Sequence, residues 1–283
     1  MIHDDFLINK NIDANNKKLL EQLLIASNEA PNIVRYWKGS DTKELFENKV
    51  GTELRPYEDE QYEYWKDKEI EYKFNEYGFR SNDSFDGEGI VCLGCSYTQG
   101  TGLPIEYNWG YKLAKKLNTK HFNLGQGGLG LDSAYRLLLG FSKKLKFKKV
   151  FLLTPPPYRY EWFIADNTLI DPYLNTKPDL LQWLVQSMGS NKHVKQPYEK
   201  FFKSFFFGSE FNDIIHEHRT IQAIRGLCSE LNVDFYYRTH YLNRIENESI
   251  KDKPNIPARD GHPGSAQQEF YYNSFLKMVN ENN

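Results

Sequence analysis

Short apolar runs alternate with amphipathic stretches over most of the chain after residue 87. Four runs have the length and flanking residues of strands: Gly89–Leu93, Lys120–Leu124, Lys149–Thr154 and Val233–Arg238. Gly89–Leu93 and Lys149–Thr154 are expected to be buried. Helical periodicity follows each of the four runs, over Glu106–Leu117, from Asp132 or Ser133, from Asn212 or Asp213 to Leu231, and over Ser265–Met278. This alternation predicts an α/β fold with parallel strands, right-handed crossovers and helices on both faces of the sheet.

The other segments do not follow this rhythm. We expect a helix over Asp13–Ala30, a half-exposed strand over Ile70–Phe74 and a helix-like stretch over Leu180–Met188. Residues 1–86 are predicted to form an N-terminal extension that packs on a domain spanning residues 87–283. Residues 158–211 are expected to form an aromatic insertion over the carboxyl edge of the sheet. A lid or substrate wall is one interpretation of it, and additional core or an oligomer contact is the other.

Composition narrows the classes of function. The formal net charge is -2, so the chain lacks the basic surface expected of a nucleic-acid-binding protein. No apolar run approaches the ~20 residues of a membrane span, and the absence of a signal-peptide pattern predicts a cytoplasmic protein. Among the three cysteines, Cys92 is expected to be a small buried apolar residue rather than a redox or zinc ligand. We expect no metal and no cofactor, and the oligomeric state stays open.

Candidate chemistry comes from two distant segments. Ser96 lies in a small, polar turn directly after the first strand, and Asp260 and His262 lie in a loop before the last helix. Open α/β sheets place their reactive groups at the carboxyl ends of the strands, so these three residues can converge there. The combination predicts acyl transfer. Histidine takes the serine proton, aspartate holds the imidazole, and backbone N–H groups stabilise the oxyanion.

Three segments resemble, in order, the sequence blocks of the SGNH, or GDSL-like, hydrolase family: Gly94–Gly100, Asn123–Gly128 and Asp260–Gly264. The resemblance implies a three-layer α/β/α domain with a flavodoxin-like sheet and a serine esterase with a catalytic triad. It implies that Ser96 is the nucleophile, His262 the base and Asp260 its partner. It also implies an oxyanion hole formed by the N–H groups of Ser96 and Gly128.

Two departures from the family pattern change the expectation. The family has an oxyanion-hole asparagine after the third strand, whereas this chain has prolines there, which lack an N–H. Thr154, Tyr158 and Arg159 are the candidates to replace it or to contact substrate. In addition, only one residue separates Asp260 from His262 where the family usually has two. Some carbohydrate O-acetyl esterases and transferases look similar in this respect, which favours a glycan or small-molecule ester as substrate, with acetylated sugars first.

Other functions stay open at this point. A non-catalytic SGNH-fold module for binding or structure would explain the missing asparagine. An O-acyltransferase would share the first half of the esterase reaction and differ only in the acceptor. Nucleotide binding by Gly125–Gly130 is disfavoured, because the loop lacks the G-x-G-x-x-G spacing.

Overall fold

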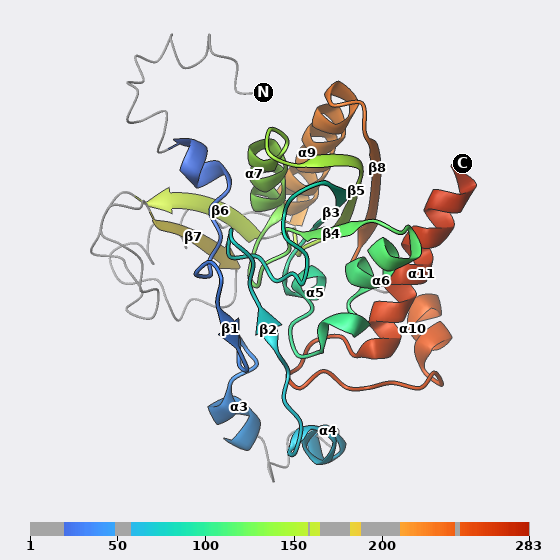
Figure 1. Cartoon of the computed structure of the whole chain (residues 1–283). Helices are drawn as coiled ribbons and strands as arrows, with labels where there is room; N and C mark the ends of the chain where they lie inside the picture. Colours follow the sequence, from blue (N-terminus) through green and yellow to red (C-terminus); the bar gives the residue numbers. More distant parts are fainter. Residues whose placement is uncertain are drawn as a thin grey trace.

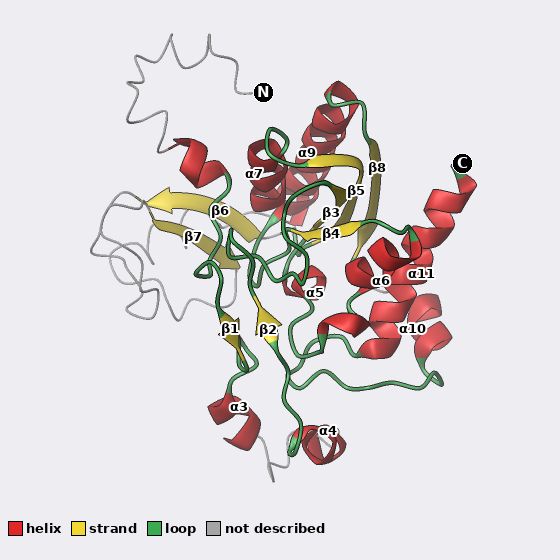
Figure 2. Cartoon of the chain, in the orientation of Figure 1, coloured by secondary structure: helices red, strands yellow, loops and turns green. Residues whose placement is uncertain are grey.

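The centre of the molecule is a parallel sheet of four strands. The computed structural model describes residues 20–48, 58–157, 159–164, 182–187, 210–240 and 244–282. The strands are β3 (Glu88–Leu93), β4 (Lys120–Asn123), β5 (Lys146–Thr154) and β8 (Asp234–Thr239), and their order in the sheet is β4-β3-β5-β8. Every neighbouring pair is parallel. The predicted α/β class and the parallel sheet are therefore confirmed (Figures 1 and 2).

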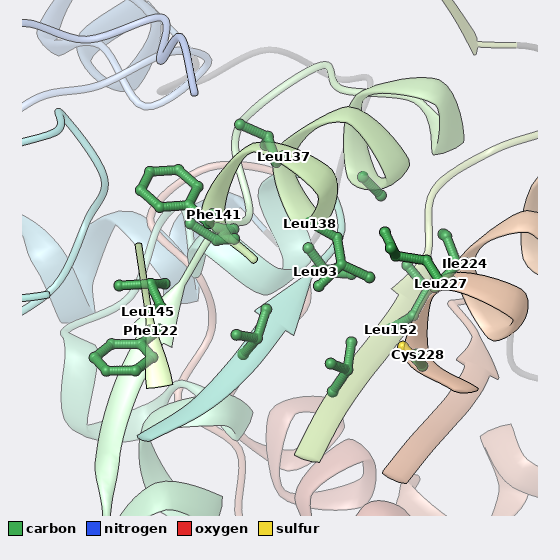
Figure 3. Packing of buried hydrophobic residues seen from close by; sticks show 14 of the residues in the cluster. Leu93, Phe122, Leu137, Leu138, Phe141, Leu145, Leu152, Ile224, Leu227 and Cys228 are labelled. Carbon is green, nitrogen blue, oxygen red and sulfur yellow. The ribbon is translucent and has the colours of Figure 1, made fainter. Parts of the chain in front are cut away.

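Helices pack against both faces of this sheet because successive side chains of each strand point to opposite faces. On one face, Val91 and Leu93 of β3 lie in a buried cluster with α7 (Leu131–Phe141) and α9 (Glu210–Glu230). Figure 3 shows this cluster, in which α7 contributes Leu137, Leu138 and Phe141, and α9 contributes Ile224, Leu227 and Cys228.

The opposite face has its own core. Ile90 and Cys92 of β3 lie in a second cluster with residues of α6 (Trp109–Lys116) and α11 (Ser265–Glu281). Figure 1 shows α7 and α9 on one side of the sheet and α6 and α11 on the other. Because all four strands end at the same edge, the loops that follow them lie near one another.

Several element boundaries differ from the predicted ones. The helix expected over Glu106–Leu117 is instead a 3-10 turn, η1 (Ile105–Tyr107), followed by α6. Asn108 separates the two because its side chain accepts hydrogen bonds from the N–H groups of Gly110 and Tyr111 and so caps α6. The strand β5 begins three residues earlier than predicted, at Lys146. A short helix, α10 (Arg244–Ile250), lies where only a polar loop was expected.

The N-terminal segment, residues 20–48 and 58–86, contains short elements and a third small core. The elements are β1 (Val34–Arg35), α3 (Lys43–Asn48), α4 (Glu58–Trp65) and β2 (Tyr72–Lys73). Ile70, Tyr72 and Phe74 are buried and Lys73 is exposed, so the predicted alternation is correct although the strand is shorter. The helix predicted to reach Ala30 ends at Leu24, because Ser27 and Asn28 bond to distant segments instead.

The described part of the aromatic insertion is a β-hairpin. β6 (Arg159–Ile164) pairs antiparallel with β7 (Gln182–Ser187). The helix-like interpretation of Leu180–Met188 is therefore wrong, since residues 182–187 satisfy their backbone groups by pairing with another strand. The hairpin is joined to α7 by an ion pair of 2.8 Å between Glu161 and Arg136. Tyr158 and the phenylalanine-rich residues 201–207 lie outside the described residues.

The cysteines behave as buried apolar side chains. Cys92, Cys95 and Cys228 are free and buried, and burial raises the pKa of the Cys92 thiol well above its ordinary value. Within the described ranges, no helix is long and apolar enough to cross a membrane.

Candidate active site

Ser96 is the first residue of a four-residue helix, α5 (Ser96–Gln99), that follows β3 directly. The residue as a whole is 6% exposed. An N–H at the first helical position has no acceptor within the helix. The backbone N–H and the hydroxyl of Ser96 therefore both lie at the start of α5, at the carboxyl end of β3.

The loop after β4 brings Gly128 to the same edge of the sheet. The Gln126 N–H donates to the Gly94 carbonyl at 3.3 Å, and the Gly127 N–H donates to Gln99 Oε1 at 3.1 Å. Gly128 has a φ of +80°, which favours glycine, and a Cβ at this position would stand in open space. Its N–H donates to no residue that the structure describes. The loop therefore offers an unused backbone donor in an open position.

Asp260 and His262 form a hydrogen-bonded pair. His262 Nδ1 lies 2.7 Å from Asp260 Oδ2, and the His262 backbone N–H donates to Asp260 Oδ1 at 3.1 Å. The Asp260 side chain is buried, whereas that of His262 is 17% exposed. Because Nδ1–H donates to the carboxylate, the neutral imidazole has its lone pair at Nε2, the tautomer that a general base requires.

The loop that carries this pair packs on the turn that begins at Ser96. The Arg259 N–H donates to the Gly102 carbonyl at 2.7 Å. A Cβ at Gly102 would overlap Asp260 Oδ1, so this close approach needs glycine. The ring of Tyr97 lies 5.6 Å from that of His262. The structure therefore brings the Asp260–His262 loop beside α5, although no hydrogen bond of the described residues joins the Ser96 hydroxyl to His262.

The N-terminal segment holds this loop from outside. Asp41 accepts two hydrogen bonds of 2.7 Å from the Arg259 guanidinium, and both side chains are almost fully buried. Asp41 also accepts from the Tyr72 hydroxyl at 2.5 Å, and that hydroxyl accepts from the Gly102 N–H at 2.8 Å. A continuous chain of hydrogen bonds thus runs from the Ser96 turn, through residues of the N-terminal segment, to Arg259 beside Asp260.

Of the three candidates for the third oxyanion donor, Arg159 has the most suitable environment. Burial raises the pKa of Glu217, and the neighbouring Thr154 hydroxyl partly counteracts this, so that hydroxyl already interacts with a carboxylate. Tyr158 lies outside the described residues. Arg159 begins β6, and its carbonyl packs against Gly130 of the Gly128 loop. Among the residues that the structure describes, its Nε and Nη1 have no hydrogen-bond partner, although both atoms are enclosed. Enclosed donors without partners are costly, and a bound ligand would remove that cost.

The charges around the site favour an ionised aspartate. Burial raises the pKa of Asp260, but the hydrogen bond from His262, its positive charge and the Ser40 hydroxyl together hold that pKa below its ordinary value. Nearby, burial lowers the pKa of His240 to about 4, and the charge of Arg159 also lowers it. The His240 ring lies 5.3 Å from that of Tyr97. His240 is therefore neutral near pH 7, while Asp260 is charged.

Sequence reasoning missed the residues that support the site. Ser40, Asp41 and Tyr72 are far from the Asp260 loop along the chain. No local pattern indicates that Ser40 bonds to Asp260, that Asp41 bonds to Arg259 or that Tyr72 bonds to Gly102. The only signal available was Arg259, a charged residue directly before Asp260. No cluster of three or more possible metal ligands occurs in the described part of the chain. No model of a known protein family and no curated protein matches this sequence, so the interpretation rests on the residues and their geometry.

Proposed function

We propose that this protein is a serine esterase of the SGNH type, which hydrolyses a carboxylic ester through an acyl-enzyme on Ser96. The observation that carries the proposal is the Asp260–His262 hydrogen bond in a loop packed against the turn that begins at Ser96. The parallel sheet with helices on both faces supports a three-layer, flavodoxin-like architecture.

The reaction would proceed in two steps. The Ser96 hydroxyl attacks the ester carbonyl while His262 Nε2 takes its proton, and Asp260 stabilises the resulting imidazolium. Collapse of the tetrahedral intermediate expels the alcohol, which receives that proton from His262. Water, activated by the same imidazole, then attacks the acyl-enzyme and releases the acid. Because apo enzymes often have long catalytic hydrogen bonds, the absence of a Ser96–His262 hydrogen bond is compatible with this sequence.

The oxyanion would be held by three donors. The N–H groups of Ser96 and Gly128 are available at the same edge of the sheet, as described above. The Arg159 guanidinium supplies the third donor in place of the family's asparagine, since two of its enclosed nitrogens have no partner in the described part of the chain. A positive charge at this position also favours a substrate or intermediate that develops negative charge.

The substrate class follows from the spacing of the last block. With one residue between Asp260 and His262, the loop resembles that of carbohydrate O-acetyl esterases, so an acetylated glycan or small sugar ester is the proposed substrate. Transfer of the acyl group to a sugar hydroxyl would use the same first step with a different acceptor.

The proposal is tested by hydrolysis of p-nitrophenyl acetate and p-nitrophenyl butyrate. Ser96→Ala should abolish hydrolysis because it removes the nucleophile. Cys95→Ala is the matched control, since Cys95 is a buried neighbour in the same turn. It should hydrolyse both esters at close to the wild-type rate. Hydrolysis by Ser96→Ala as fast as that of the wild type would show that Ser96 is not the nucleophile.

A non-catalytic module for binding is the second candidate. It is favoured by the absence of a hydrogen bond between the Ser96 hydroxyl and His262 in the described residues, and by the missing third-block asparagine. This candidate predicts that wild-type protein hydrolyses neither ester above the rate of Ser96→Ala.

A further inference from the structure

A tight turn of the N-terminal segment reaches the Asp260–His262 pair. The Lys38 N–H donates to the Asp41 carbonyl at 2.7 Å, and the Asp41 N–H donates to the Lys38 carbonyl at 3.0 Å. Gly39 lies between them and has a φ of +65°. Ser40 at the tip of this turn donates its hydroxyl proton to Asp260 Oδ2 at 2.5 Å. The two residues are separated by 220 positions in the sequence.

The hydrogen bond from Ser40 is directed to the oxygen that also binds the imidazole. Ser40 Oγ lies 2.5 Å from Asp260 Oδ2 but 3.4 Å from His262 Nδ1. A hydroxyl has one proton, and an ionised carboxylate is the stronger acceptor, so the donation goes to Asp260. Oδ2 therefore receives hydrogen bonds from both Ser40 and His262, while Oδ1 receives the His262 backbone N–H. Three donors fix the plane of the carboxylate.

The position of this turn is fixed independently of Ser40. The next residue, Asp41, forms the buried ion pair with Arg259, the residue before Asp260. The Arg259 guanidinium also lies over the Trp37 ring at 3.7 Å and donates to the Tyr36 carbonyl. Gln61 donates to the carbonyls of Ala258 and Asp260. The turn and the Asp260 loop are thus held together as a unit, which keeps the Ser40 hydroxyl in place.

We propose that Ser40 is a positioning residue of the candidate active site, which orients the Asp260 carboxylate toward His262. The N-terminal segment then contributes a residue to the candidate active site, in addition to packing on the domain. This inference rests on the proposed function for its consequence in catalysis, but the orientation itself can be measured without activity.

The kinetic test uses Ser40→Ala with a p-nitrophenyl ester. Hydrogen bonds to charged groups are among the stronger ones, and Ser40 remains in contact with solvent, so kcat should fall about tenfold while KM changes little. Ser40→Thr keeps the hydroxyl and should restore most of the activity. Thr42→Ala is the matched control, because it removes a hydroxyl that caps α3 in the same segment without touching the pair.

The second test is the downfield proton resonance of the hydrogen-bonded His262 Nδ1–H. It is assigned by its loss in His262→Gln. Ser40→Ala should shift or broaden it, and Ser40→Thr and Thr42→Ala should leave it in place. A Ser40→Ala protein with an unchanged resonance and a kcat within twofold of wild type would overturn the inference. If the resonance responds to Ser40→Ala but wild-type protein hydrolyses no ester, the proposed function fails and the positioning of Asp260 by Ser40 stands.

Discussion

Arg159 is the residue proposed to replace the missing oxyanion-hole asparagine. Its enclosed Nε and Nη1 are donors without acceptors in the described structure, and its charge lies close enough to His240 to lower the pKa of that residue. A planar guanidinium presents several donors in a fixed arrangement, which an ammonium group does not. We therefore expect the geometry of the guanidinium donors, and not only the positive charge, to contribute to oxyanion stabilisation.

Arg159→Ala should lower kcat by about 10²–10³, the usual cost of losing one oxyanion donor, with a smaller change in KM. Arg159→Lys should recover little of this loss. Arg225→Ala is the control, since Arg225 lies on the exposed side of α9, where it donates to Gln222 and lies over the Tyr237 ring. Steady-state kinetics of ester hydrolysis measures all three. A kcat for Arg159→Ala equal to that of the wild type would remove Arg159 from the oxyanion hole.

The N-terminal segment is the element whose role differs most from its appearance in the sequence. It reads as an irregular extension, yet Asp41, Tyr72 and Gln61 bond to the loops that carry the candidate catalytic groups. Asn28 makes a similar contact with the loop after β4, where its N–H donates to Gln126 Oε1 at 3.0 Å. Loss of this segment should therefore disturb the site before it disturbs the central sheet.

Asp41→Ala should lower the free energy of unfolding by about 3–5 kcal/mol, because it leaves the Arg259 charge buried without its partner. Urea unfolding measures this quantity. Glu47→Ala serves as the comparison, since Glu47 pairs with Lys43 on the exposed surface of α3. Such pairs contribute about 0.5 kcal/mol or less. Equal losses in the two variants would contradict a buried, structurally important ion pair.

For the whole molecule, two buried histidines make stability depend on pH. Burial lowers the pKa of His121 to about 3 and that of His240 to about 4. In the unfolded chain these groups bind protons below about pH 6.5, whereas in the folded protein they remain neutral until much lower pH. Because the unfolded state binds more protons in this range, the free energy of unfolding falls on acidification from about pH 6.5 toward pH 4.

His121→Leu isolates one of these contributions. His121 is almost fully buried, and neither ring nitrogen has a hydrogen-bond partner in the described structure, so replacement by leucine removes no hydrogen bond of the ring. Between pH 6 and pH 4, acidification should lower the unfolding free energy of the wild type relative to that of the variant, by about 1.4 kcal/mol per pH unit. Urea unfolding at several pH values measures it, and parallel pH curves would contradict the assignment.

The sequence pattern predicted the sheet more completely than the site. The runs at β3 and the second half of β5 are buried and apolar, so these strands could be read directly. β4 and β8 are more polar, and their predicted place in the α/β alternation identified them. Residues 182–187 could not, because their strand depends on pairing with β6 and not on a local period. Ser96, Asp260 and His262 stood out by their positions near strand and helix ends. Ser40 did not, since its hydrogen bond closes a loop of 220 residues.

An active-site-directed fluorophosphonate probe on the folded wild-type protein reports whether Ser96 is a reactive nucleophile. We expect one stoichiometric adduct, located on Ser96 by peptide mass spectrometry. The adduct should be lost in Ser96→Ala and form much more slowly in His262→Gln. If the folded protein forms no adduct, or is labelled equally after Ser96→Ala, Ser96 is not a catalytic nucleophile.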